Sequence, residues 1–310
     1  MKIGIVGAGG VGGYYGGQLA RVGTDVGFVA RGEHLAAIRE HGLRVRTSEE
    51  DFVVRVTASA DPAEIGACDA VLFCVKSYDT ESAAALLDPL LKPATAVVSL
   101  QNGVDNEEKI AARIGAEHVL GGASFILAQV AEPGVVERTG TLQSIVFGEL
   151  DGSGSDRADA LLAACREAGI DARVTDDIRR VLWDKYAFLC ALAGLTAVTR
   201  IPIDELMRVP ETRELFRQMV REVALVARAE GVELGDELAD EKAEFAAGLE
   251  PGGFSSLHHD LVTGRRIELD ALHGELVRRA SRHNLSVPVT AIVYALLRPW
   301  EVGRERAAAS

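Results

Sequence analysis

The sequence has little of what marks several classes of protein. Its 310 residues contain only four cysteines. These cysteines form no C-x-x-C pair, and no group of histidines stands at the spacing of a zinc site. They are Cys68, Cys74, Cys165 and Cys190. We therefore expect buried free thiols in a reducing cytoplasm, and no metal site.

Long uncharged apolar runs are also missing. The uncharged segment at residues 186–199 holds fourteen residues, fewer than the roughly 18 that span a bilayer. The N-terminus, MKIGIVGAGG, lacks a basic lead, an apolar signal core and a cleavage site. We expect folded structure from the first residue, a cytoplasmic location and no membrane partner.

Positive charge is in deficit. The chain has 33 Lys and Arg against 46 Asp and Glu, a net charge of -13. Nucleic acids and anionic membranes bind through basic faces, so this charge argues against both as partners. Hydrophobic residues make up 48% of the chain, which is long enough for two domains with buried cores. A small anionic ligand would need a local positive site.

Two patterns divide the chain. Up to about residue 150, short apolar runs such as KIGIVG and DAVLFCVK alternate with helical stretches. This alternation predicts parallel strands joined by crossover helices. The runs GVVERTG and LQSIVFGEL predict two more strands, separated by Gly140. Beyond residue 176 strand signals vanish, and helices are predicted at residues 179–198, 211–230, 236–248, 255–284 and 288–298.

The predicted fold is therefore an α/β, Rossmann-like domain over residues 1–176, followed by an all-α domain over residues 177–310. We see no internal repeat in the sequence. The long helices of the second half could pair two chains into a homodimer, but an internal core uses the same apolar stripes.

A glycine-rich loop, GAGGVGG, follows the first predicted strand and matches G-x-G-x-x-G. Gly7 permits a tight turn, Gly9 lets the backbone approach a pyrophosphate, and Gly12 allows close packing of helix on strand. The phosphates would lie at the positive N-terminus of the helix. A glycine-rich turn can also be purely structural. Its position between strand and helix favours a dinucleotide site formed by Gly7, Ala8, Gly9, Gly10, Val11 and Gly12.

The residues at the next strand ends bear on the choice of cofactor. About 20 residues after the loop, NAD-binding proteins usually carry an acid for the ribose 2'-hydroxyl. This sequence has Arg31 there, and a guanidinium suits a 2'-phosphate through paired hydrogen bonds. Lys76, at the end of VLFCVK, could add a second cation at the same sheet edge. We predict NADPH over NADH, while solvated strand ends are the alternative explanation of both cations.

Six motifs occur in a fixed order over nearly the whole chain. They are KIGIVGAGGVG, VAR at Arg31, VLFCVKS at Lys76, LQNGV at Asn102, LWDKYAF at Lys185 and SSLHHDLVTGRRIELD near the C-terminus. In this order they resemble the ketopantoate reductases, which are 2-dehydropantoate 2-reductases. The resemblance implies hydride transfer from NADPH to the 2-oxo carbon of ketopantoate, which gives pantoate on the route to pantothenate and coenzyme A.

The resemblance also implies a role for each matching residue. Lys185 matches the catalytic lysine, whose ammonium can stabilise the charge that builds on the ketone oxygen and deliver a proton. Asn102 matches a residue beside the nicotinamide, where its amide can position the lysine or the cofactor. Ser256 matches the serine that holds the substrate, and Glu268 matches the active-site acid. A carboxylate near Lys185 would help to keep that lysine charged.

Plain structural roles compete with these. Ser256 could cap the helix that begins at SSLHHD, and Asn102 opens an Asn-Gly turn pair. Glu268 lies on a helical stripe of mainly packed residues, which favours a paired or ligand-contacting acid. In one unbroken helix Ser256 and Glu268 would lie about 18 Å apart. Either the helix breaks near Thr263 and Gly264, or one residue addresses the substrate while the other, Glu268, addresses the cofactor ribose or Lys185. We favour the second explanation.

The chain departs from the family pattern at three positions. Where the resemblance expects asparagines, it has Leu189, Ala193 and Gly253. A site that loses polar partners for a substrate hydroxyl discriminates less, or differently. A reductase of another, more apolar 2-oxo acid is therefore the first alternative. A non-catalytic NADPH-binding sensor is the second, although such a protein has little use for a lysine at the head of an apolar helix.

Overall fold

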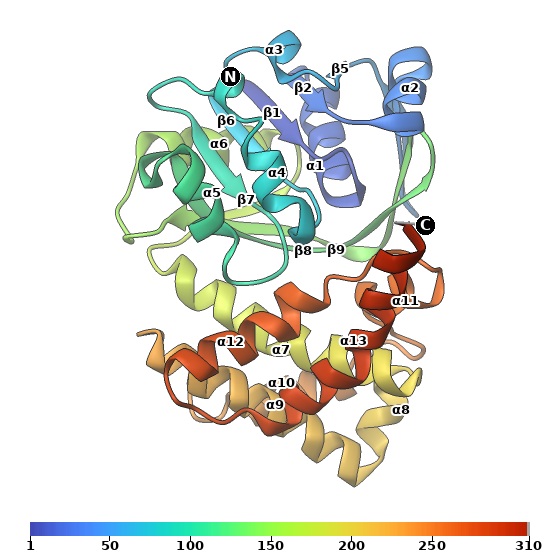
Figure 1. The fold of residues 1–310 in the computed structure, drawn as a ribbon. Helices are drawn as coiled ribbons and strands as arrows, with labels where there is room; N and C mark the ends of the chain where they lie inside the picture. The colour runs from blue at the N-terminus through green and yellow to red at the C-terminus, as the bar shows by residue number, and fades with distance from the viewer. Residues whose placement is uncertain (309–310) are drawn as a thin grey trace. The chain divides into compact units, whose positions relative to one another are not determined.

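A computed structural model describes residues 1–308, with side-chain positions described as far as residue 301. The backbone forms two compact units (Figure 1). The first unit comprises Met1–Gln101 and Asn106–Arg179, and the second comprises Asn102–Asp105 and the chain from Arg180. The division predicted between residues 176 and 177 stays a prediction. The short segment Asn102–Asp105 is the part of the N-terminal half that joins the helical unit.

The first unit is built on one mixed sheet of ten strands. Their order is β4-β3-β9-β8-β7-β6-β1-β2-β5, with β10 also paired to β9. The strands are β1 (Lys2–Val6), β2 (Asp25–Val29), β3 (Leu43–Arg46), β4 (Asp51–Val54), β5 (Thr57–Ser59), β6 (Ala70–Phe73), β7 (Ala96–Ser99), β8 (Val119–Glu132), β9 (Val135–Glu149) and β10 (Asp171–Val174). Strands β8, β7, β6, β1, β2 and β5 pair in parallel, whereas β8 with β9 and β3 with β4 pair antiparallel.

Both faces of the central strands are buried. In β6, Ala70 and Leu72 belong to one core cluster, and Val71 and Phe73 belong to the other. Strands covered on both faces are continuously apolar, as the sequence pattern predicted. The helices of this unit are α1 (Gly10–Arg21), α2 (Gly32–His41), α3 (Pro62–Ile65), α4 (Thr80–Ala84), α5 (Asn106–Ile114) and α6 (Asp156–Glu167), with short 3-10 turns η1 (Ser77–Asp79), η2 (Asp88–Leu90) and η3 (Ala116–His118). The α/β class is confirmed.

Some strands differ from the prediction. The two strands expected on either side of Gly140 are one strand, β9, which continues through the glycine at a φ of 69°. The pairing of β8 with β9 shifts register between Ile126 and Leu127, and such a bulge lets a strand bend without ending. Strands β3, β4, β5 and β10 were not predicted, because each has only three or four residues and includes exposed positions.

The second unit is helical, as predicted. Its elements are α7 (Ile178–Thr199), α8 (Ile203–Arg208), α9 (Pro210–Ala229), α10 (Leu238–Ala247), α11 (Ser256–Val262), the π-helical turn η4 (Asp270–Gly274), α12 (Glu275–Arg282) and α13 (Pro288–Ala308). Helices α7, α9, α10 and α13 correspond to predicted helices, whereas the short α8 was not foreseen. In Figure 1 this unit runs from yellow to red.

The single helix predicted over residues 255–284 is wrong. Helix α11 ends at Val262, and Gly264 follows with a φ of 78°, the left-handed region that favours glycine. Helical structure resumes only after Glu268. The apolar spacing could not reveal the break, because Leu261 and Glu268 are buried on either side of it.

Helix α7 is apolar enough to need an explanation. Among the described helices, it alone is long and apolar enough to cross a membrane by length and composition, with a mean hydropathy of 1.4 in its best window. The uncharged segment at residues 186–199 is shorter than this 18-residue window, because the window may include up to two charged residues. In the structure 67% of the window is buried, and Ala187 and Cys190 lie in the core of the second unit. Core helices pass the same test.

All four cysteines are free thiols, as predicted. Cys74 is half-buried, although burial was predicted for all four. The other three are buried, and burial raises the pKa of the Cys165 thiol to about 12. Such a thiol stays protonated and unreactive at neutral pH.

Candidate functional site

The glycine loop joins β1 to α1 in the first unit. Gly7 has a φ of 98°, and a Cβ there would lie 2.8 Å from the backbone nitrogen of Val75. A Cβ on Gly10 would lie 2.1 Å from the carbonyl oxygen of Ala128, and one on Gly12 would lie 2.2 Å from the carbonyl oxygen of Gly7. The fold itself therefore requires glycine at these three positions.

Gly9 differs from these glycines. A Cβ on Gly9 would meet no protein atom within 4 Å, so packing does not require this glycine. It is also the N-cap residue of α1, and no side chain caps that helix end. An open backbone at a helix N-terminus is the arrangement that a pyrophosphate needs. The residues present therefore fit a dinucleotide.

The other loop residues are held by neighbours. Val11 is half-buried and packs on the core of the first unit. The carbonyl of Ala8 lies 2.8 Å from Nε2 of His34, and the N–H of Gly134 donates to Nδ1 of His34 at 3.0 Å. Because Nδ1 accepts a hydrogen bond, we assign the ring hydrogen to Nε2, which donates to Ala8. Burial lowers the pKa of His34, which favours this neutral ring.

The two predicted phosphate cations lie in the first unit. Arg31 is the N-cap residue of α2, and its side chain is 74% exposed. Its Nη2 lies 3.3 Å from Oδ2 of Asp79, at the end of η1. Half-buried Lys76 directly precedes η1 as its N-cap residue. The structure thus brings Arg31 to the segment that Lys76 begins, and the exposed guanidinium remains accessible to a ligand.

Lys185 lies near the start of α7 in the second unit and is half-buried. Trp183 and Tyr186 flank it, are 4% and 1% exposed, and pack edge to face with ring centroids 5.7 Å apart. The Tyr186 hydroxyl donates to the carbonyl of Leu272 at 2.6 Å. Packing and this hydrogen bond hold the helical turn that carries the lysine.

Asn102 is half-buried and begins the segment that joins the second unit. Gly103 follows at a φ of 112°, so the Asn-Gly pair does form a turn. Val104 is 8% exposed and belongs to the same core cluster as Trp183 and Tyr186. Asn102 and Lys185 are therefore parts of one compact unit, and the functional role of the Asn102 amide stays a prediction.

Ser256 is the first residue of α11, and it is exposed. The expectation that it could cap this helix is wrong. The cap is Ser255, whose Oγ accepts from the N–H of His258 at 3.1 Å. The N-cap residue directly precedes the first helical residue. Because the helix begins at Ser256, the capping serine is Ser255. The Ser256 hydroxyl is thus not used by the helix.

Glu268 is 6% exposed, so its predicted place on a packed stripe is correct although the helix is not continuous. Its carbonyl accepts from the N–H of Leu272 at 3.2 Å. Leu272 is also the residue whose carbonyl binds Tyr186. The break after Val262 means that Glu268 and Ser256 are not separated by one straight helix. Whether they address one partner or two stays a prediction.

The three departures from the family pattern take part in packing or backbone contacts. Leu189 is half-buried against the second unit's core, and Ala193 is 2% exposed within it. The carbonyl of Gly253 accepts from the N–H of Ile203 at 2.9 Å. None of the three presents a polar side chain.

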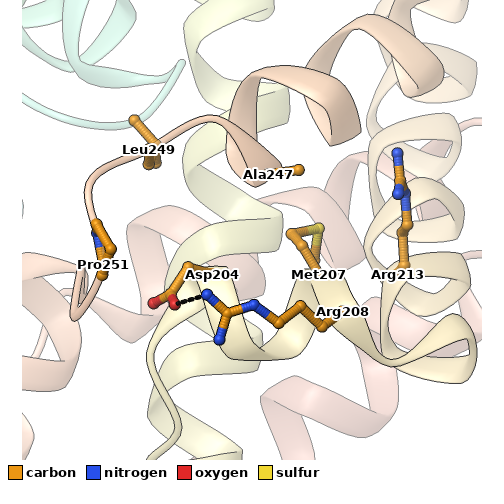
Figure 2. A pocket seen from close by; sticks show the side chains of 7 residues that line it. All are labelled: Asp204, Met207, Arg208, Arg213, Ala247, Leu249 and Pro251. Atoms are coloured by element: carbon orange, nitrogen blue, oxygen red, sulfur yellow. Dashed lines mark ion pairs between the residues drawn. The ribbon is translucent and has the colours of Figure 1, made fainter.

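A cavity of about 400 Å³ lies elsewhere in the second unit (Figure 2). It is lined by Asp204, Met207, Arg208, Arg213, Ala247, Leu249 and Pro251. Asp204 and Arg208 face each other at 3.0 Å, and Arg213 pairs with Glu244. The cavity contains none of the predicted site residues, and these charges are already paired, so we do not assign it as the site. Among the side chains that the structure describes, up to residue 301, no group of three or more His, Cys, Asp or Glu could hold a metal ion.

A glycine loop between the first strand and the first helix of a mainly parallel sheet defines a Rossmann-type dinucleotide-binding protein. The reaction that such a fold supports is decided by its site and its relatives. The model of the family described as ketopantoate reductase PanE/ApbA matches residues 3–152, and the model of its C-terminal domain matches residues 177–301. The chain belongs to the ketopantoate reductase family, and it is an NADP-dependent oxidoreductase.

Known proteins resemble it over their full length. It is 34% identical over 302 residues to the 2-dehydropantoate 2-reductase of Halobacterium salinarum, covering 96% of this chain and 98% of the relative. It is 31% identical to the uncharacterized oxidoreductase YkpB of Bacillus subtilis, covering 97% and 99%. A crystal structure of a PanE/ApbA family ketopantoate reductase from Ralstonia eutropha matches with a TM-score of 0.90 at 37% identity, covering 98% and 100%.

Proposed function

We propose that the protein reduces 2-dehydropantoate to pantoate with NADPH, and that Lys185 is the general acid. The observation that carries this proposal is the composition of the second unit: Lys185, Asn102, Ser256 and a buried Glu268 all belong to it. A half-buried lysine and a buried acid suit a reaction in which charge develops on an oxygen.

NADPH, when bound, supplies the hydride. The open backbone at Gly9 and the first amides of α1 would hold the pyrophosphate. The guanidinium of Arg31 would bind the 2'-phosphate, and Lys76 would add positive charge. The amide of Asn102 would position the cofactor or the lysine. With these roles the protein would select NADPH over NADH.

In the second unit, Lys185 acts on the ketone. Its ammonium stabilises the negative charge that forms on the oxygen and donates the proton, so that the lysine ends the step neutral and regains a proton from water. Glu268 favours the charged lysine, and the exposed hydroxyl of Ser256 donates to the substrate carboxylate. The Ser256 hydroxyl is available for this role because Ser255, not Ser256, caps the helix.

A second candidate is the reduction of a more apolar 2-oxo acid. The half-buried Leu189 and the buried Ala193 favour it, because neither can bind a substrate hydroxyl. A site that does bind this hydroxyl rejects an analogue lacking it by about 10⁴-fold, whereas an apolar pocket discriminates about 100-fold or less.

A matched pair of substrates separates the two candidates. Ketopantoate and 3,3-dimethyl-2-oxobutanoate differ only by one hydroxyl, and kcat/KM for each is measured with NADPH. We expect ketopantoate to be preferred at least about 100-fold. A preference for the analogue supports the second candidate, and Leu189→Asn should then shift the ratio towards ketopantoate. No NADPH oxidation with either acid, or with other branched 2-oxo acids, would favour the non-catalytic sensor.

A further inference from the structure

Arg279 on α12 is a buried cation that the proposed reaction does not yet use. Its side chain is 4% exposed. Its Nε donates to Glu275 at 2.8 Å, and its Nη1 donates to Glu230 at 2.8 Å. The remaining nitrogen, Nη2, lies 3.4 Å from the carbonyl oxygen of Val104. One guanidinium thus connects two acids and a distant backbone segment.

The groups that Arg279 contacts adjoin two predicted active-site residues. Val104 is two residues after Asn102, within the segment Asn102–Asp105. The guanidinium carbon also lies 6.0 Å from the ring centroid of Trp183, two residues before Lys185. Both contacts lie within the second unit. Arg279 therefore hydrogen-bonds to the segment that Asn102 begins and lies over the Trp183 ring of the helix that carries Lys185.

Stability alone does not account for this arrangement. Removing an arginine and its acids from water is costly, and apolar residues of similar volume often hold a fold equally well. Glu230 is nevertheless favoured in its charged form. Although burial opposes it, the hydrogen bond from His283 and the charge of Arg279 lower the pKa of Glu230. A planar guanidinium differs from an apolar side chain because its hydrogen bonds fix both the direction and the distance of the groups that it contacts.

We propose that Arg279 is a positioning residue for the reaction, which holds the Asn102 turn in register with the helix that carries Lys185. This inference rests on the proposed function of Asn102 and Lys185. Glu275 and Glu230 orient the guanidinium, the Val104 carbonyl receives it, and the face of Trp183 supports it. A lysine could keep the charge beside Glu275 but could not reach all of these groups in one plane.

The test compares Arg279→Lys with the control Arg282→Lys. Arg282 also pairs with Glu275, at 2.9 Å, but its side chain is 59% exposed. Both variants keep the positive charge of the residue they replace. An apolar replacement such as Arg279→Met would leave Glu275 and Glu230 without this cation and could unfold the protein, so Arg279→Lys is the variant that tests the proposal. Kinetics are measured well below the unfolding temperature of each variant, with the folded fraction checked by NADPH titration.

We expect Arg279→Lys to lower kcat by about 10- to 100-fold, the scale of an ångström-sized misplacement of reacting groups. NADPH affinity should change by less than about threefold, and the isotope effect on hydride transfer from 4-deuterated NADPH should rise as chemistry becomes limiting. Arg282→Lys should match the wild type. Asn102→Ala combined with Arg279→Lys should be little worse than Asn102→Ala alone, because both act through one turn.

An unchanged kcat in Arg279→Lys overturns the positioning role, as does a loss that the folded fraction explains fully. Effects of Asn102→Ala and Arg279→Lys that multiply independently would also overturn it. The failure of the proposed function looks different. An inactive wild type, tested with every 2-oxo acid, overturns that function and this role together, whereas an active wild type isolates the result for Arg279.

Discussion

The two units hold their functional residues by different means. In the first unit the backbone does so: Gly7, Gly10 and Gly12 lie against other backbone atoms, which leaves Gly9 open. In the second unit side chains do so, through the Tyr186 hydroxyl and the paired guanidinium of Arg279. Many ligands carry a phosphate, and backbone amides can bind it whatever the side chains are. Each substrate has its own shape and polar groups, and side chains can change to fit it without loss of the fold. The departures from the family pattern fall in the side-chain half.

The largest effect that this comparison predicts is at Lys185. Lys185→Ala should lower kcat by about 10²- to 10⁴-fold, because it removes the proposed proton donor and a charge that matters most in the transition state. NADPH affinity, which we assign mainly to residues of the first unit, should stay within about threefold of the wild type. Lys242→Ala is the control, because Lys242 pairs at 2.6 Å with Asp184, the neighbour of Lys185 in the sequence, and has no proposed part in the reaction. A Lys185→Ala variant with normal turnover would remove this residue from the mechanism.

The glycine loop offers the next contrast. Gly10→Ala places a Cβ against the Ala128 carbonyl and should lower the free energy of unfolding by about 1–3 kcal/mol. Gly9→Ala has open space around its Cβ, so it should keep this stability and weaken NADPH binding by at least about tenfold. Urea unfolding and calorimetric titration measure the two effects. Equal behaviour of the two variants would contradict the distinction between a packing glycine and a ligand glycine.

Arg31 tests the choice of cofactor. Loss of hydrogen bonds to a charged group costs about 1.5–3 kcal/mol, so Arg31→Ala should weaken NADPH binding by about 10- to 100-fold. NADH, which has no 2'-phosphate, should change by less than about threefold. Arg44→Ala is a suitable control, because this exposed arginine of the same unit pairs with Asp51. Equal weakening of both cofactors would refute the 2'-phosphate role.

The smallest effect concerns pH and the second unit. His273 is fully buried, its Nε2 lies 2.9 Å from the carbonyl oxygen of Cys190, and burial lowers its pKa to about 4. The unfolded chain, with a pKa of about 6.5, takes up the proton first as pH falls. The free energy of unfolding should therefore fall from about pH 6.5 towards pH 4, by about 1 kcal/mol at pH 5.5.

The matched variants for this prediction are His273→Gln and His259→Gln, the latter at an exposed position. His273→Gln should flatten the pH dependence, whereas His259→Gln should keep it. Unfolding curves between pH 5.5 and 7.5 measure the slopes. If His273→Gln keeps the wild-type slope, another group causes the dependence.

Much of the fold could be predicted because its signals are local. Strand, glycine loop and helix follow one another within the first 21 residues, and continuous apolar strands indicated a covered sheet. The helices α7, α9 and α10 carry their own periodic patterns. A break near Thr263 and Gly264 was considered but not favoured, because apolar spacing says nothing of the left-handed φ of Gly264. The same limit applies to β9, whose register shift at Gly140 lies in its pairing with β8.

The site was predicted only as far as its motifs reach. Asn102, Lys185 and Glu268 could be named from the sequence, and the structure shows which unit each belongs to. Their supports were missed. Arg279 and Val104 are 175 residues apart, and His34 and Gly134 are 100 apart. Contacts of that separation leave no periodic or spacing signal. The Glu275 and Arg279 pair at i and i+4 was the one local hint.

The most direct test of the account is a single turnover with labelled cofactor. Purified protein in excess over NADPH deuterated at the transferred position is mixed with ketopantoate, and the product is analysed by mass spectrometry and NMR. The account predicts one pantoate for each NADPH oxidised, with deuterium on C2, and a rate that Lys185→Ala lowers by about 10²-fold or more. NADPH oxidation without deuterium in pantoate, or no oxidation by any 2-oxo acid, would contradict it.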